Sequence, residues 1–144
     1  LPLPAGAICL SPWVDLTLSG ESIRSKAASD PILDAANLGR YAAAYAAQAP
    51  LTSPLISPLF ADLQGLPPML IQAGGEEILL DDATRLADRA GQAGVSVTLE
   101  TWDGLFHVFP VMAFLPETKQ ALQQVSTFVA QLPGKDAVDC LPLP

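Results

Sequence analysis

Two segments about thirty residues apart carry the side chains that could do acid–base chemistry. The first, residues 74–82, reads Gly-Gly-Glu-Glu-Ile-Leu-Leu-Asp-Asp and follows an apolar run. The second, residues 102–107, reads Trp-Asp-Gly-Leu-Phe-His and ends on the only histidine of the chain. An acid and an imidazole base in the turns after successive strands are two of the three members of a nucleophile–base–acid triad.

The third member of such a triad is missing from the sequence. Its nucleophile commonly lies in a Gly-x-Ser-x-Gly turn, and no such pattern occurs among the 144 residues. The chain also opens on Leu1 rather than on Met. Both features are expected of the C-terminal half of a serine hydrolase whose nucleophile precedes this segment.

His107 is placed to act as the base. It follows the turn Trp102-Asp103-Gly104, directly after a predicted strand. In open α/β sheets the loops at the carboxyl ends of strands form the ligand crevice. A neutral imidazole there can take a proton from a nucleophile and return it to a leaving group.

The first segment contains four carboxylates, and their positions relative to the predicted helix indicate different roles. Asp81 and Asp82 stand at the predicted start of a helix, where capping and compensation of the helix dipole are expected, above all for Asp82. Glu76 and Glu77 precede that helix, so either could accept the Nδ1–H of the histidine and hold its tautomer.

A metal site is the rival chemistry for this cluster. However, the sequence has no His-Glu-x-x-His or Cys-x-x-Cys spacing, and its sole imidazole comes from a different loop. Gly74-Gly75 also lacks the glycine and lysine of a phosphate-binding loop. We therefore expect no metal site and no phosphate-binding loop.

Three segments predict strands. Residues 5–10 and 68–73 are almost continuously apolar, which is typical of strands buried on both faces of a parallel sheet. Residues 95–100 alternate apolar and polar side chains and predict a half-buried strand nearer the sheet edge.

Apolar residues at helical spacing predict three helices. They cover residues 34–48, 82–90 and 117–132. In the first of these, Leu38, Tyr41 and Tyr45 share one side. Strands that alternate with helices through short turns predict an α/β fold, with three mostly parallel strands and flanking helices. We expect residues 1–133 to form this domain, with a long excursion at 14–67, and residues 134–144 to form a tail.

Composition excludes several classes of protein. A net charge of −8 argues against nucleic-acid binding, which needs a basic face. No apolar run approaches the roughly 18 residues of a membrane span, and the chain does not open on a signal-peptide pattern. Cys9 and Cys140 give no disulfide framework, so a reducing, cytoplasmic setting is expected.

Four motifs in chain order resemble the bacterial hormone-sensitive lipase family of α/β-hydrolases. They are Leu-Ser-Pro-Trp-Val-Asp-Leu at 10–16, Ser-Pro-Leu-Phe-Ala-Asp at 57–62, Gln-Ala-Gly-Gly-Glu-Glu-Ile-Leu-Leu-Asp-Asp at 72–82 and Gly-Leu-Phe-His-Val-Phe at 104–109. The resemblance covers roughly residues 3–132. It implies that the chain is the C-terminal portion of an α/β-hydrolase fold, with Glu77 as the triad acid and His107 as the base. The family often has Asp at the position of Glu77.

The resemblance further implies a complete enzyme that cleaves short to medium acyl esters without a cofactor, with its nucleophile outside this chain. We expect the segment alone to be inactive. The alternative is a non-catalytic α/β module that binds a ligand or partner. In the complete protein we expect the strand at 95–101 to lie at the open edge of the sheet, where two copies can pair as a homodimer. The alternative is that Glu100 and the C-terminal helix protect this edge and the protein stays monomeric.

Overall fold

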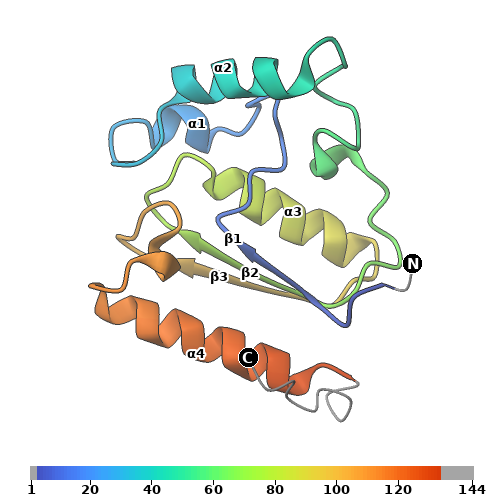
Figure 1. Ribbon diagram of the computed structural model, residues 1–144, viewed down its shortest axis with the longest axis vertical. Coiled ribbons are helices and arrows are strands. Elements are labelled where there is room, and N and C mark those ends of the chain that lie inside the picture. The colour runs from blue at the N-terminus through green and yellow to red at the C-terminus, as the bar shows by residue number, and fades with distance from the viewer. Residues whose placement is uncertain (1–2, 134–144) are drawn as a thin grey trace, which may run out of the picture.

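The computed structural model describes residues 3–133 (Figure 1). The predicted tail, residues 134–144, lies outside the described residues. The elements in chain order are β1 (Ala7–Leu10), α1 (Ser22–Ser25), α2 (Ala35–Ala46), the 3₁₀ turn η1 (Pro58–Phe60), β2 (Met69–Gly74), α3 (Leu80–Gln92), β3 (Val97–Trp102), the 3₁₀ turn η2 (Phe109–Val111) and α4 (Pro116–Gln131).

The centre of the molecule is a parallel sheet with the strand order β1-β2-β3. Met69 of β2 lies opposite Ala7 on one side and Val97 on the other. The central strand is buried along its whole length, as its apolar sequence predicts. The expected α/β fold with three parallel strands and flanking helices is therefore confirmed.

The first strand is more exposed than its apolar sequence predicts. Ile8 is 39% exposed, and the rest of β1 is only partly buried. Within the described residues β1 pairs with β2 alone, so its other edge carries no partner strand. An apolar strand that is only partly buried and has one free edge is what remains when a central strand lacks its second neighbour.

Helices α3 and α4 cover opposite faces of the sheet (Figure 1). The small and apolar residues Ala83, Leu86 and Ala90 of α3 are buried in one cluster with Ile71 and Ala73 of β2. This helix begins two residues before the predicted start at Asp82, so the turn that follows β2 is short.

On the other face, α4 packs through Ala121, which is fully buried. Gln72 of β2 reaches toward this helix, and its Nε2 donates to the Ala121 carbonyl at 2.9 Å and to Glu100 Oε2 at 2.8 Å. These two bonds satisfy the amide N–H groups of a glutamine in a central, buried strand, whereas its Oε1 has no partner among the described residues.

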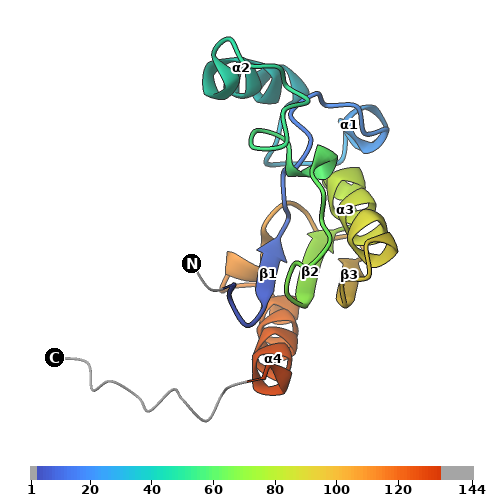
Figure 2. The same ribbon diagram turned by 90° about the vertical axis from the view of Figure 1, so that its right-hand side faces the viewer.

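The excursion at 14–67 carries α1, α2 and η1. Figure 2 shows it as a layer beyond the carboxyl ends of the strands. Its own apolar cluster consists of Ile23 and Leu38 from the excursion with Ile78 and Leu79 from the turn after β2. The excursion is therefore anchored on the segment that was predicted to carry the acid.

Helix α2 turns a different side to the body than its pattern predicts. Leu38, Ala42 and Ala46 are buried, whereas Tyr41 and Tyr45 are 61% and 71% exposed. The expected shared side of Leu38 and the two tyrosines is therefore not the buried side. Small alanines let α2 approach the cluster, and the tyrosines stay at the surface.

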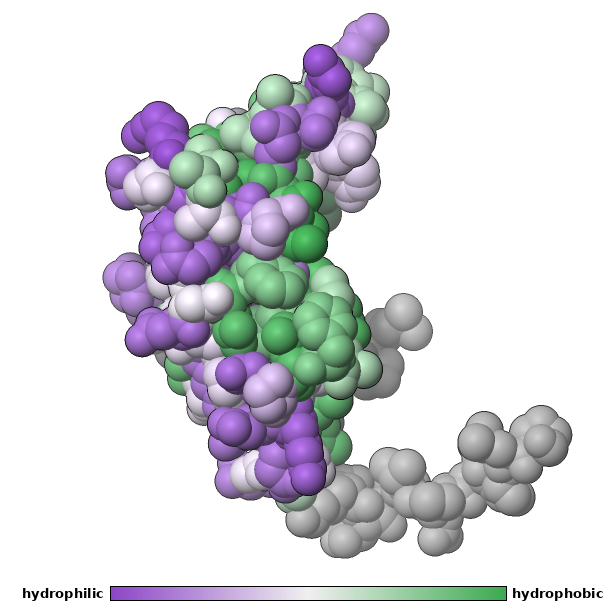
Figure 3. Space-filling model, turned by 90° about the vertical axis from the view of Figure 1, so that its left-hand side faces the viewer, coloured by the Kyte–Doolittle hydropathy of each residue, from purple (hydrophilic) through white to green (hydrophobic). Residues whose placement is uncertain are grey.

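Apolar surface gathers across the middle of one face of the molecule (Figure 3). Exposed apolar side chains among the described residues include Ile8, Val111 and Phe114. None of the helices at residues 3–133 combines the length and apolar character needed to cross a bilayer.

Candidate active site

The acid turn (residues 74–77) and the base loop (residues 103–108) leave the sheet next to each other. The Gly75 N–H donates to the Trp102 carbonyl at 2.8 Å, and the Glu76 N–H donates to the Leu105 carbonyl at 2.9 Å. These bonds continue the pairing of β2 and β3 past the ends of the strands. The two segments are therefore held in a fixed register.

Gly74 makes this close approach feasible. A Cβ at this position would lie 2.4 Å from the Leu105 carbonyl oxygen and 2.7 Å from that of Phe106. Both contacts are to backbone, which has little freedom to move aside. Only glycine lets the acid turn lie directly on the base loop.

Glu77 and His107 meet at this junction. The His107 Nδ1 atom lies 3.4 Å from Glu77 Oε2. The Glu77 side chain is fully buried, and the His107 side chain is 17% exposed. Neither carboxylate oxygen nor Nδ1 has a hydrogen-bond partner within the described part of the chain. The pair is thus matched by position but not yet closed into a hydrogen bond, as is common in catalytic sites without substrate.

Glu76 points elsewhere. Its Oε1 lies 3.2 Å from Lys26 Nζ, and its side chain is 38% exposed. Of the two neighbouring glutamates, only Glu77 faces the imidazole. The geometry therefore favours the residue that the family resemblance selects, and the catalytic roles of Glu77 and His107 stay predictions.

Asp82 does not cap its own helix, so that expectation is wrong. It lies inside the first turn of α3, and its Oδ2 accepts the N–H groups of Val14 and Asp15, both at 2.8 Å. Burial raises the pKa of Asp82 to about 6, although the two N–H donors oppose this shift. Asp82 instead ties the start of the excursion to α3.

Two other aspartates strengthen the same connection. Asp81 Oδ2 accepts the N–H groups of Glu21 and Ser22 at the start of α1. Asp15 is buried and receives an ion pair from Arg85 at 2.9 Å. Burial raises the pKa of Asp15, but hydrogen bonds from its polar neighbours outweigh burial and leave it below the ordinary value.

The carboxylates of Asp15, Glu76, Asp81 and Asp82 therefore bind N–H groups, hydroxyls or cations of the protein itself, in contrast to Glu77. Within residues 3–133 no group of three His, Cys, Asp or Glu side chains is arranged to hold a metal ion.

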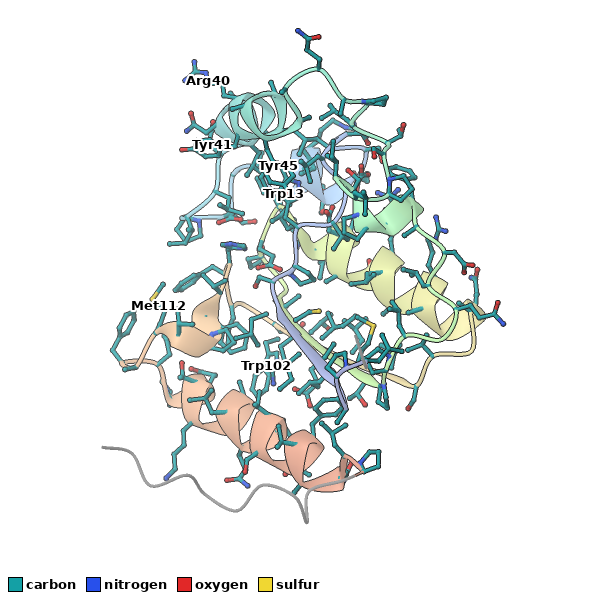
Figure 4. All side chains as sticks on the ribbon, turned by 45° about the vertical axis from the view of Figure 1, so that its right-hand side comes forward. Trp13, Arg40, Tyr41, Tyr45, Trp102 and Met112 are labelled. Atoms are coloured by element: carbon teal, nitrogen blue, oxygen red, sulfur yellow. The ribbon has the colours of Figure 1, made fainter. Side chains whose placement is uncertain are left out.

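An apolar pocket of about 380 Å³ opens between α2 and the body of the molecule. Its lining residues are Trp13, Leu16, Tyr41, Tyr45, Leu55, Ile56 and Pro58. Figure 4 shows Trp13 and Tyr45 close together beneath α2. The sequence signal for this pocket was the pair of tyrosines, Tyr41 and Tyr45, which the sequence places four residues apart on one side of the helix.

One lining residue of the pocket, Trp13, lies in the segment that leaves the carboxyl end of β1. Trp13 follows the last residue of β1 by three positions, and its indole Nε1 donates to the Asp15 carbonyl at 3.2 Å. An apolar group bound in this pocket would thus lie beside the segment that leaves β1.

Comparison with known proteins finds relatives that are named as hydrolases of esters or of acetyl groups. A family model described as alpha/beta hydrolase fold matches residues 1–111. The acetyl-hydrolase of Streptomyces hygroscopicus is 44% identical over 138 residues, which is 93% of this chain and 45% of that protein. An esterase of Acinetobacter venetianus is 40% identical over 132 residues, which is 90% of this chain and 44% of that protein.

Solved structures agree. An esterase from the bacterial hormone-sensitive lipase family superimposes with a TM-score of 0.89 at 47% identity, covering 92% of this chain and 45% of that one. A hormone-sensitive lipase from a metagenome library gives a TM-score of 0.86 at 43% identity, covering 90% of this chain and 45% of that one. The chain thus spans a little under half the length of the proteins it matches, and the resemblance to this family is confirmed.

Proposed function

The chain belongs to the α/β-hydrolase family, and we propose that the complete protein hydrolyses carboxylic esters of small acyl groups with Glu77 as the triad acid and His107 as the base. The observation that carries this proposal is the contact of 3.4 Å between His107 Nδ1 and the buried Glu77 carboxylate. The relatives named as esterases and acetyl-hydrolases support it.

The proposed chemistry follows from which ring nitrogen faces the acid. With Nδ1–H directed at Glu77, the lone pair of Nε2 is free to take the proton of a serine hydroxyl as that oxygen attacks the ester carbonyl. The imidazolium is stabilised by the buried carboxylate and returns the proton to the leaving alcohol. Water then attacks the acyl-enzyme with the same base. The serine and the oxyanion donors lie outside this chain.

The apolar pocket would hold one arm of the substrate. Its volume of about 380 Å³ suits a short acyl or alkoxy group, and its aromatic walls would exclude water from that group. We propose that the excursion at 14–67 in this way forms part of the wall of the substrate site.

We also propose that β3 supports a homodimer. Within the described residues β3 pairs with β2 on one side alone, and its burial alternates along the strand. An unpaired strand edge can accept the same edge of a second copy about a two-fold axis.

The experiment that tests the proposed activity completes the chain. The unmatched portion of the Streptomyces hygroscopicus acetyl-hydrolase is fused to the amino end of residues 1–144, and this completed hydrolase is assayed with p-nitrophenyl butyrate. We expect turnover that is abolished by a serine-directed fluorophosphonate and by His107→Ala. A folded His107→Ala variant that turns over p-nitrophenyl butyrate as fast as the parent protein would refute the proposal.

A further inference from the structure

Ser11 reaches from the end of β1 to the base loop. Its Oγ accepts the N–H of Val108, the residue after His107, at 2.9 Å. Ser11 is itself 4% exposed and held by a bond of 2.7 Å from its own N–H to the Gln72 carbonyl. A rigid hydroxyl from a different strand thus binds the peptide that carries the base.

The backbone at this point needs such support. Val108 has a φ of 48°, a left-handed conformation that a β-branched side chain rarely adopts. Unfavourable backbone of this kind persists only where the surroundings hold it in place, and it is concentrated at functional sites. The bond to Ser11 is one interaction that holds it.

Asp30 binds the peptide that follows Glu77, as Ser11 binds the peptide that follows His107. Its Oδ2 accepts the N–H of Ile78, the residue after Glu77, at 2.9 Å. Its other oxygen, Oδ1, accepts the N–H groups of Ile32 and Leu33 at 2.9 Å and 3.0 Å. Each oxygen therefore has its own donors, and the carboxylate bridges the excursion to the acid turn.

The carbonyl of the same residue is held as well. Ser22 Oγ donates to the Ile78 carbonyl at 2.7 Å, and the Ile78 side chain is fully buried in the apolar cluster of the excursion. The peptide groups of Ile78 are thus fixed on both sides by side chains from the excursion rather than by the sheet.

We infer that Ser11 and Asp30 are positioning residues, which keep His107 and Glu77 in contact by fixing the peptide that follows each of them. The contact they hold is long, at 3.4 Å, so any displacement that separates the two loops weakens it further. The inference rests on the proposed function, in which the contact between Glu77 and His107 orients the catalytic base.

The test uses the single imidazole of the 144-residue chain as its own reporter. With ¹⁵N-histidine labelling, the shifts of the two ring nitrogens at a pH where the ring is neutral give the ratio of the Nδ1–H to the Nε2–H tautomer. Contact with Glu77 favours Nδ1–H. Glu77→Leu removes the acceptor and sets the baseline ratio.

The two variants are chosen to break one bond each. Ser11→Ala deletes the hydroxyl. Asp30→Asn keeps the shape but turns an amide N–H₂ toward a backbone N–H, whichever way the amide is oriented. We expect each to lower the tautomer ratio roughly five-fold, as the loss of one hydrogen bond would. Ser25→Ala and Asp62→Asn, whose side chains bond only within their own turn or loop, are matched controls and should leave it unchanged.

Two outcomes would overturn the inference. One is a wild-type ratio in Ser11→Ala and Asp30→Asn, with dispersed backbone amide signals. The other is loss of that dispersion in both variants, because the side chains would then support the fold as a whole.

A third comparison separates this inference from the proposed function. If Glu77→Leu changes the ratio and neither variant does, the inference fails and Glu77 keeps its role. If Glu77→Leu changes nothing, Glu77 does not orient the imidazole, and both the proposed triad and the positioning role are refuted.

Discussion

The Nδ1 atom of His107 lies 3.4 Å from Glu77 Oε2, while the carboxylate of the preceding residue, Glu76, pairs with Lys26. Two adjacent glutamates thus have separate partners, because successive residues in the acid turn point in different directions. One is buried against the imidazole and the other is partly exposed. This difference allows the role of each to be tested by the same substitution.

In the completed hydrolase, Glu77→Ala and His107→Ala should each lower kcat by roughly 10³-fold or more, because the base or its orienting partner is lost. Glu76→Ala and Asp81→Ala should cost far less, since their carboxylates bind Lys26 and the start of α1. Steady-state kinetics with p-nitrophenyl butyrate decides this. An inactive Glu76→Ala beside an active Glu77→Ala would place the triad acid one residue earlier.

Gly74→Ala should destabilise the fold by about 1–3 kcal/mol and also lower activity, because its Cβ would meet the Leu105 carbonyl at 2.4 Å. The matched control is Gly91→Ala in α3, where a Cβ meets nothing within 4 Å. That variant should be more stable than the wild type by about 0.5–1 kcal/mol. Urea unfolding measures both. Equal stability of the two variants would show that the base loop yields without cost.

Asp82 should make folding stability depend on pH. Its pKa rises from 3.8 to about 6 in the folded protein, so the folded chain holds a proton that the unfolded chain releases between these values. Stability from this group is complete below about pH 4, falls as pH rises, and is lost above about pH 6. The total loss is about 3 kcal/mol.

The matching variant is Asp82→Asn, which carries no charge at any pH. Subtracting its free energy of unfolding from that of the wild type at each pH isolates Asp82 from other carboxylates, such as Asp15, whose pKa is shifted the opposite way. We expect the difference to decline between pH 4 and pH 6. A difference that rises over that interval would mean that the two N–H donors outweigh burial.

Tyr45→Ala should raise the KM of the completed hydrolase for p-nitrophenyl butyrate several-fold and change kcat little. The substitution removes part of the wall of the apolar pocket and leaves the triad residues in place. Arg40→Ala is the control, since it lies on the same helix but does not line the pocket. A KM that stays unchanged in Tyr45→Ala would remove the pocket from the substrate site.

The strands could be predicted because their signals are local, whereas the choice of Glu77 over Glu76 came from the family resemblance, and the catalytic roles of Glu77 and His107 stay predictions. The apolar run before Gly74 and the alternation at 95–100 each reflect the faces that a strand buries. The fixed spacing of Glu77 and His107 from the strand ends then brought them to one edge of the sheet. The partial exposure of β1 could not be read from its apolar sequence, because burial there depends on a neighbour that the described residues do not supply.

The supporting contacts could not be predicted, because they join residues far apart in sequence. Ser11 binds a peptide 97 residues away, Asp30 one 48 residues away, and Asp82 one 68 residues away. Nothing in the local pattern separates these from an ordinary turn serine or a helix-capping aspartate. Asp82 was assigned to its own helix for that reason, since capping is the common use of an aspartate at a helix start.

The final prediction concerns the open edge of β3. The bonds from Met69 N–H to the Ser96 carbonyl and from Gly75 N–H to the Trp102 carbonyl bracket the ladder between β2 and β3. N–H groups alternate in direction along a strand. Those of residues 98, 100 and 102 therefore point toward β2, and that of Thr101 points toward the free edge of the sheet. Thr101→Pro should therefore remove a donor from the free edge without breaking the internal ladder.

Sedimentation velocity of the completed hydrolase should show a dimer for the wild type and for Thr101→Val, which keeps the N–H, and a monomer for Thr101→Pro. A monomeric wild type at micromolar concentration would refute the proposed dimer, and a dimeric Thr101→Pro would move its interface away from this edge.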